Sequence, residues 1–151
     1  MLSLKAPPAL LLLIAGALIL GLDSLWPALS TPFPGHRLLA LAAALSASLL
    51  VAAGGLAFRR ARTTVNPMNP TQARALVTAG VYRYTRNPMY LGFVLLLVGW
   101  ALYLANLPAL LVVVGFIGYM NRYQIHPEER TLARLFGAAY REYCQRVRRW
   151  L

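Results

Sequence analysis

The chain of 151 residues is strongly apolar and strongly basic: 59% of its residues are hydrophobic, 13% are charged, and the formal net charge is +11. Soluble domains are about 25% charged, and a chain this short buries too little surface to hide so much apolar area from water. The composition excludes an ordinary soluble domain and predicts a membrane protein. Because the arginines flank apolar runs, we expect the lipid bilayer as a partner and no nucleic acid.

The first two apolar stretches each predict a transmembrane helix. Ala6–Leu22 carries no charge, and its flank extends the first expected span to 6–26. A signal peptide would need a small-residue cleavage site, which the following Gly-Leu-Asp-Ser does not supply, so we interpret the run as a retained anchor. Leu38–Phe58 is 21 residues without a charge, close to the roughly 20 that cross a bilayer core, and predicts a second span over 37–58.

The third apolar stretch is too long for one crossing. Asn87–Asn121 contains no charged residue over 35 positions, which is about 50 Å as a single helix. Asn106-Leu107-Pro108 lies near its middle, and such a sequence interrupts a helix. We therefore predict a helical hairpin over 88–121, with arms Pro88–Ala105 and Pro108–Met120.

Thirteen of the fifteen basic residues fall in two segments, the connector 59–87 and the tail after the hairpin. Short loops rich in arginine stay in the cytoplasm, and a hairpin begins and ends on one side of the membrane. Both segments and both termini are therefore expected in the cytoplasm. The basic residues concerned are Arg59, Arg60, Arg62, Arg74, Arg83, Arg86, Arg122, Arg130, Arg134, Arg141, Arg146, Arg148 and Arg149.

The tail is expected to form a C-terminal amphipathic helix over 127–150. Pro127 suits a first helical turn, and Glu128 and Glu129 suit the positive end of the helix dipole. Apolar residues recur there at spacings of three and four. Periodicity favours a helix on the membrane surface, and a lid packed on a cofactor is the alternative. The fold class predicted overall is an all-α integral membrane helical bundle, in a single domain over 1–151.

Several chemistries are excluded by the residues present. Cys144 is the only cysteine, so an internal disulfide is impossible. His36 and His126 are the only histidines, and the expected topology separates them, so no metal site is predicted. The sequence contains no Ser-His-Asp set and no phosphate-binding glycine loop.

The densest unusual segment is Gly80–Gly92, which carries three tyrosines, two arginines and an Asn-Pro turn where an apolar helix begins. A plain membrane-interface anchor explains the tyrosines and arginines. It does not explain the polar break, whose free backbone groups need partners unless they line a cavity. The acidic pair Glu128-Glu129 is either a ligand for a cation or an ordinary helix-start charge.

Two motifs resemble the isoprenylcysteine carboxyl methyltransferase and phospholipid methyltransferase superfamily. The first is Leu76-Val77-Thr78-x-Gly80-Val81-Tyr82-x-x-x-Arg86-Asn87-Pro88-x-Tyr90-x-Gly92. The second, about 35 residues on, is Glu128-Glu129-x-x-Leu132-x-x-x-Phe136-Gly137-x-x-Tyr140-x-x-Tyr143. The resemblance covers roughly 63–150. It implies an S-adenosylmethionine-dependent methyltransferase of bacterial type, in the inner membrane, with a cofactor pocket at the cytoplasmic surface.

The resemblance also implies site residues. Those expected to bind the cofactor, S-adenosyl-L-methionine, are Arg74, Ala75, Leu76, Val77, Tyr82, Asn87, Pro88, Met89, Tyr90 and Glu128. Those expected to act in catalysis are Glu129, Arg122 and Tyr90. The chain departs from the family at Asn87, where many members have His, and at Gln124, where the prenylcysteine enzymes place an arginine thought to hold the substrate.

The residues themselves are consistent with methyl transfer from a sulfonium, which depends on positioning and electrostatics rather than on a covalent nucleophile. The expected acceptor is lipophilic or small: a prenylcysteine-like carboxylate, a phospholipid amine or a similar group. Glu129 is the first candidate base for an amine. The alternatives are a membrane NADPH-dependent reductase of related fold and a non-enzymatic membrane protein. Oligomeric state is not indicated by the sequence.

Overall fold

The computed structural model describes residues 6–62 and 75–151, and within them every regular element is a helix. The main helices are α1 (Pro8–Leu25), α2 (His36–Arg60), α3 (Pro88–Tyr103), α4 (Leu110–Tyr119) and α5 (His126–Arg146). Short 3-10 turns, η1 (Pro27–Leu29), η3 (Gly80–Arg83) and η4 (Leu107–Ala109), and a π-helical segment, η5 (Met120–Ile125), join them.

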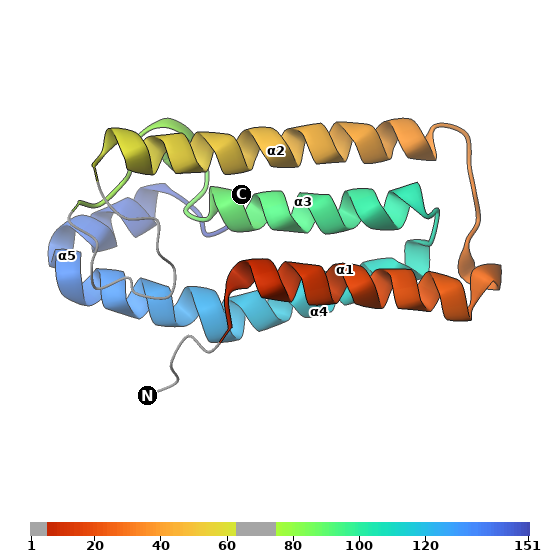
Figure 1. Cartoon of the computed structure of the whole chain (residues 1–151). Coiled ribbons are helices and arrows are strands. Elements are labelled where there is room, and N and C mark those ends of the chain that lie inside the picture. Colours follow the sequence, from red (N-terminus) through yellow and green to blue (C-terminus); the bar gives the residue numbers. More distant parts are fainter. Residues whose placement is uncertain (1–5, 63–74) are drawn as a thin grey trace.

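The helices α1 to α4 run side by side as a bundle with α3 at its centre (Figure 1). Helix α2 packs on one side of α3, and α1 and α4 pack on the other. Helices α1 and α2 are long and apolar enough to cross a membrane, with only 17% of each apolar window buried inside the protein. Exposed leucines on such helices belong in lipid rather than water, so the predicted fold class, an all-α membrane helical bundle, is confirmed.

Prolines and a tight turn set several helix ends, which lie within a few residues of the predicted bounds. Trp26 precedes Pro27 and leaves the helical conformation, with φ −133° and ψ 71°, as residues before proline do. The hairpin turns between Tyr103 and Leu110, where Ala105 adopts a left-handed φ of 53° and the Asn106 side chain accepts a hydrogen bond from the Ala109 N–H. The uncharged stretch therefore folds back on itself as predicted.

The C-terminal helix differs from the prediction at its start, within its length and at its end. It does not begin at Pro127, because α4 continues through η5 into α5 with helical dihedrals at Tyr119, Met120, Ile125 and His126. A proline ring clashes with the carbonyl four residues before it, and the wider π turn just upstream relieves that crowding. The helix also breaks at Gly137, with φ 51° and ψ −118°, a conformation that suits only glycine.

The break at Gly137 reverses the chain, so that the end of α5 returns toward the first turn of α3 and the C-terminus lies beside it (Figure 1). Helix α5 ends at Arg146 rather than at 150. The tail is neither one straight surface helix nor a separate element. It is a helical hairpin in its own right at one end of the bundle.

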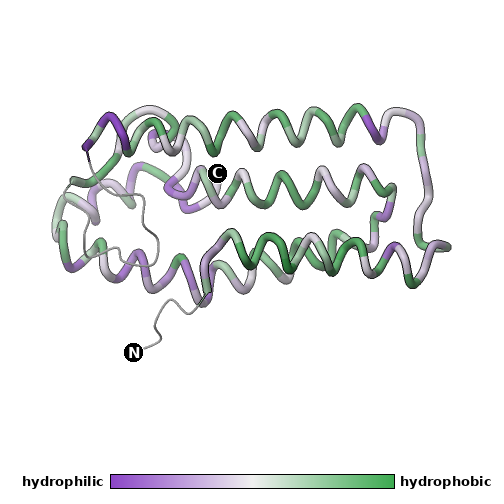
Figure 2. The backbone as a smooth tube through the Cα atoms, in the orientation of Figure 1, coloured by the Kyte–Doolittle hydropathy of each residue, from purple (hydrophilic) through white to green (hydrophobic). Residues whose placement is uncertain are grey.

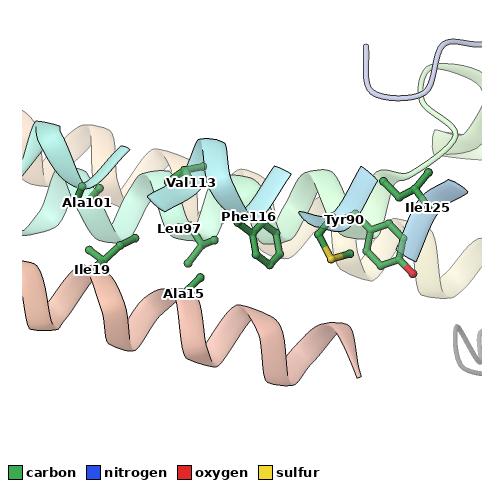
Figure 3. Close-up of a cluster of buried hydrophobic side chains, with 10 residues drawn as sticks. Ala15, Ile19, Tyr90, Leu97, Ala101, Val113, Phe116 and Ile125 are labelled. Atoms are coloured by element: carbon green, nitrogen blue, oxygen red, sulfur yellow. The ribbon is translucent and has the colours of Figure 1, made fainter. Parts of the chain in front are cut away.

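Polar residues concentrate at that end of the bundle and at the turns of the opposite end, while apolar residues fill the length between them (Figure 2). The main buried cluster joins α1, α3 and α4, and Figure 3 shows Ile19, Leu97, Val113 and Phe116 meeting there. A second cluster at the polar end consists of Tyr140, Tyr143 and Val147, with Leu76 and Phe136 packed against it.

The contact between α2 and α3 depends on small residues. A Cβ built on Gly99 would lie 3.1 Å from the Ala40 carbonyl oxygen and 3.3 Å from the Ala43 Cβ. One built on Gly92 would lie 2.7 Å from Val51 Cγ2. Small residues let helix backbones approach closely, which drives helix association in lipid.

We expect Gly99→Leu to force α2 and α3 apart and to lower the free energy of unfolding by roughly 1–3 kcal/mol, the usual cost of overpacking. Gly115→Leu on α4 is the matched control, because a Cβ there meets nothing within 4 Å. Thermal unfolding in detergent compares them. Equal melting temperatures for the two variants would contradict this packing.

Candidate functional site

The two sequence motifs meet at a hydrogen-bonded cluster between α3 and α5. The Tyr90 hydroxyl, in the first turn of α3, donates to Glu128 Oε1 at 2.6 Å. Gln124 Nε2, on the π segment, donates to the same oxygen at 2.5 Å and to the Tyr90 hydroxyl at 3.3 Å. Tyr90 and Gln124 are buried, with 8% and 2% of their surface exposed.

The π segment explains why this cluster forms. A π turn holds one residue more than an α turn, which changes the direction of the side chains that follow it. Met120, Gln124 and Ile125 face the interior as a result, while Arg122 and Tyr123 are exposed. Glu128 follows Gln124 by one helical turn on the same face, and this is the face that meets Tyr90.

Burial raises the pKa of Glu128 to about 7 from its ordinary value of 4.5. Hydrogen bonds from Tyr90 and Gln124 lower the pKa, and the neighbouring charge of Glu129 raises it. A carboxyl group that is costly to ionise without a partner is a site suited to a cation.

Tyr82 lies beside the cluster on η3. It is 7% exposed, its ring packs edge-on against Phe58 with centroids 5.5 Å apart, and its carbonyl oxygen accepts a hydrogen bond from the Tyr143 hydroxyl at 2.8 Å. Burial first, and then the charges of Tyr143 and Glu128, raise the pKa of Tyr82, so its hydroxyl stays neutral. Two tyrosines therefore border the Glu128 carboxylate.

Glu129 faces a different set of residues from its neighbour. Arg149 donates to both of its oxygens, from Nε at 3.1 Å and from Nη2 at 2.7 Å, and Arg86 Nη1 lies 3.1 Å from Oε1. Both oxygens are thus engaged by arginines in a pairing with the forked geometry of guanidinium and carboxylate. We interpret Glu129 as a fastening point rather than a base.

The other residues expected at the site lie in different parts of the structure. Val77 is buried, and Ala75 and Leu76 are half-buried, with Leu76 against the second apolar cluster. Pro88 and Met89 face Gly54 of α2 and contribute to helix packing. The structure brings Arg122 to none of them, because its side chain is exposed on the outer face of η5. Arg74 lies outside the described residues.

Asn87 and four residues that the sequence did not single out hold the polar end together. Asn87 Nδ2 donates to the Arg149 carbonyl at 3.0 Å, and the buried Thr85 hydroxyl donates to the same oxygen at 3.3 Å. The Trp150 indole donates to Asn121 Oδ1 at 3.1 Å. These are side-chain contacts over 29 to 64 positions of sequence, which no local pattern could have indicated.

The fold and the cluster together define a class: a membrane helical bundle whose polar end is built from a helix-start turn and the helix after a hairpin. The family model for phospholipid methyltransferases (PEMT) matches residues 36–139. The chain belongs to the phospholipid methyltransferase family, which confirms the resemblance found in the sequence.

Several relatives match part of the chain. An uncharacterized protein of Haemophilus influenzae is 49% identical over 63 residues, which are 42% of this chain and 100% of that protein. Protein-S-isoprenylcysteine O-methyltransferase A of Arabidopsis thaliana is 33% identical over 88 residues, 58% of this chain and 45% of the relative. The Saccharomyces cerevisiae Protein-S-isoprenylcysteine O-methyltransferase is 36% identical over 72 residues, 48% of this chain and 30% of the relative.

The matched segment thus spans less than half the length of these methyltransferases. No solved structure matches the chain.

The raised pKa of Glu128 predicts a pH-dependent stability. Between 4.5 and about 7 the folded protein holds a proton that the unfolded chain releases, so the free energy of unfolding falls as pH rises through this window. We expect Glu128→Gln, which keeps an oxygen for Tyr90, to remove that fall and to be more stable than the unsubstituted protein at pH 8, by on the order of 2 kcal/mol.

Thermal unfolding at pH 5 and pH 8 measures the effect. Glu142→Gln is the control, because Glu142 is exposed and its ion pair within the described part of the chain is with Arg146. A pH dependence that is the same in the Glu128 variant as in the unsubstituted protein would contradict the assignment.

Proposed function

We propose that the protein is an integral membrane methyltransferase that uses S-adenosylmethionine. The observation that carries this proposal is the direct contact between Tyr90 and Glu128, which joins the two halves of the family signature at the polar end of a membrane bundle. The Protein-S-isoprenylcysteine O-methyltransferases among the relatives support the reaction class.

The residues at this end fit such a cofactor. S-adenosylmethionine carries an ammonium, a carboxylate and a sulfonium whose methyl group is activated for transfer. Glu128 is a half-buried carboxylate suited to a cation, and Tyr82 and Tyr90 supply buried aromatic rings beside it. Among the described residues, Arg86 Nε is a buried N–H donor without a hydrogen-bond partner, and a carboxylate would satisfy it.

We assign each of these groups a role in binding and orientation. Glu128 receives the cofactor's ammonium, and Arg86 stabilises its carboxylate. The rings of Tyr82 and Tyr90 stabilise the cationic sulfonium by cation–π attraction. Ala75, Leu76 and Val77 form the apolar border of the site. The chain then acts by holding the reactants in line, which is the main contribution that a displacement at a methyl group needs.

The acceptor enters from the bilayer or is a small molecule. An acceptor that already carries an electron pair, such as a carboxylate or thiolate, needs no base. Because both oxygens of Glu129 are held by arginines, we no longer assign proton removal to that residue. Incubation with methyl-labelled cofactor and a membrane extract, followed by mass analysis, identifies the molecule that becomes labelled.

We further propose that the polar end faces the cytoplasm of a bacterial inner membrane. Arginine-rich segments beside transmembrane helices stay inside, and the connector and tail carry thirteen of the fifteen basic residues. A C-terminal fluorescent-protein fusion is expected to fluoresce and an alkaline phosphatase fusion to be inactive. The reverse pattern would overturn the orientation.

Cofactor binding tests the proposed function directly. We expect the purified protein in detergent to bind S-adenosylhomocysteine, and Glu128→Ala and Tyr90→Ala each to weaken binding about tenfold or more, since charge-assisted hydrogen bonds contribute about 1.5–3 kcal/mol. Isothermal titration calorimetry gives the dissociation constants. Tyr119→Ala, an exposed tyrosine one helix away, is the control and should bind normally.

Two results would redirect the assignment. Binding of NADPH in place of S-adenosylhomocysteine would indicate a membrane reductase. Absence of binding to either would indicate a non-enzymatic membrane protein.

A further inference from the structure

The C-terminal segment Val147–Trp150 is fastened to three separate elements of the polar end. Its backbone is held by the turn before α3: the Arg86 N–H donates to the Arg148 carbonyl at 3.0 Å, and Thr85 and Asn87 donate side-chain hydrogen bonds to the Arg149 carbonyl. Its side chains contact two other elements. Arg149 grips Glu129 on α5, and the Trp150 indole donates to Asn121 on η5.

Each of these attachments ends beside a residue of the proposed site. Glu129 directly follows Glu128 on α5, the helix that presents Glu128 to Tyr90. Asn87 is three residues before Tyr90, and Asn121 is three before Gln124. The Trp150 ring also packs against the main apolar cluster, which includes Tyr90. The segment therefore contacts the three backbone stretches whose relative placement sets the Tyr90–Gln124–Glu128 cluster.

We propose that Arg149 and Trp150 form a C-terminal clamp, with Asn87 as its receptor, that positions Glu128 and Tyr90 for the cofactor. The cofactor in this proposal is S-adenosylmethionine, so the proposal rests on the proposed function. It assigns Asn87 to fastening the tail rather than to touching the cofactor, since its Nδ2 is bonded to the Arg149 carbonyl. Arg149, Trp150 and Asn87 are positioning residues and have no direct part in the reaction.

The effect of Arg149 on the titration of Glu128 distinguishes a positioning role from a purely structural one. Glu128 faces Tyr90 on α3, Tyr82 on η3, Gln124 on η5 and its neighbour Glu129, whose charge is offset by Arg86 and Arg149. Removing Arg149 leaves the Glu129 charge less compensated, so proton loss from Glu128 moves to higher pH. The pH at which binding of S-adenosylhomocysteine is half-maximal should rise with it.

The native thiol gives a readout that needs no cofactor. Cys144 is the only cysteine of the chain, it is half-buried, and Arg86 Nη1 donates to its sulfur. Opening of the clamp would free Arg86 and expose the thiol, and local opening of this kind controls the rate at which a protected group reacts. Labelling by a maleimide therefore reports the clamp.

The experiment compares Arg149→Ala, Arg149→Lys and Trp150→Phe with the full-length protein in detergent. Arg149→Lys keeps the charge without the fork, and Trp150→Phe keeps the ring without the N–H. Arg146→Ala is the matched control, because Arg146 is an exposed arginine whose ion pair among residues 6–62 and 75–151 is with Glu142.

We expect Arg149→Ala to weaken S-adenosylhomocysteine binding about tenfold, to shift its pH midpoint upward and to speed Cys144 labelling about tenfold. Arg149→Lys should restore the pH midpoint and part of the affinity. Trp150→Phe should speed labelling without moving the pH midpoint, and Arg146→Ala should match the unsubstituted protein in every measurement.

Suppose that Arg149→Ala folds and that its affinity for S-adenosylhomocysteine and its rate of Cys144 labelling both stay within twofold of the unsubstituted protein. That result would overturn the clamp. If Arg149→Ala does not fold, the decision falls to Trp150→Phe, and unchanged labelling of that variant overturns the clamp. If the unsubstituted protein binds no S-adenosylhomocysteine, the proposed function fails, and the labelling rates alone then decide the clamp.

Discussion

The arrangement of the polar end depends on one partly buried hydrogen bond, from the Tyr90 hydroxyl to the Glu128 carboxylate. A carboxylate removed from water is stable only with partners, and here the partner Tyr90 comes from a helix that starts 40 residues earlier, at Pro88. The contact therefore requires that the uncharged stretch turn at Asn106. It also requires that the chain after α4 return in the right register.

The register of the chain after α4 is set by segments whose backbone conformations lower stability locally. The π segment Met120–Ile125 gives up regular α-helical hydrogen bonding, and Gly137 adopts a backbone conformation that other residues avoid. The glycines of α3 give up side-chain packing so that α2 can approach closely. Such departures are expected where a chain gives up local stability to hold a functional arrangement.

The sequence was sufficient for the bundle and for half of the site. Charge-free runs have a length that the bilayer dictates. Hydropathy therefore predicts spans over 6–26 and 37–58, where the structure has helices Pro8–Leu25 and His36–Arg60, and the Asn-Pro turn predicts the helix start at Pro88. The contact of Tyr90 with Glu128 was accessible through the resemblance. The π turn and the reversal at Gly137 were not, because Pro127 and a glycine permit these conformations without requiring them. The contact of Arg149 with Glu129 was not either, because it joins residues 20 positions apart. The resemblance implies Arg122 as a catalytic residue, whereas the structure exposes its side chain on η5.

The adjacent residues Glu128 and Glu129 lie in different surroundings. Glu128 sits among tyrosines with a pKa raised to about 7, while Glu129 is bound by two arginines. A helix turns by about 100° per residue, which is enough to separate a residue suited to a cationic ligand from one that fastens the fold. The helix thus presents the face of the proposed site and a supporting face at the same end of the bundle.

A double-mutant cycle between Tyr90 and Glu128 is the most direct measurement of the interaction on which the site depends. The free energies of unfolding of Tyr90→Phe, Glu128→Ala and the combined variant would be measured by denaturant titration in detergent at pH 8. The structure predicts a coupling energy of about 1–3 kcal/mol, as expected for a hydrogen bond to a charged group. Additivity within about 0.5 kcal/mol would show that the two residues do not touch, and the proposed site would fall.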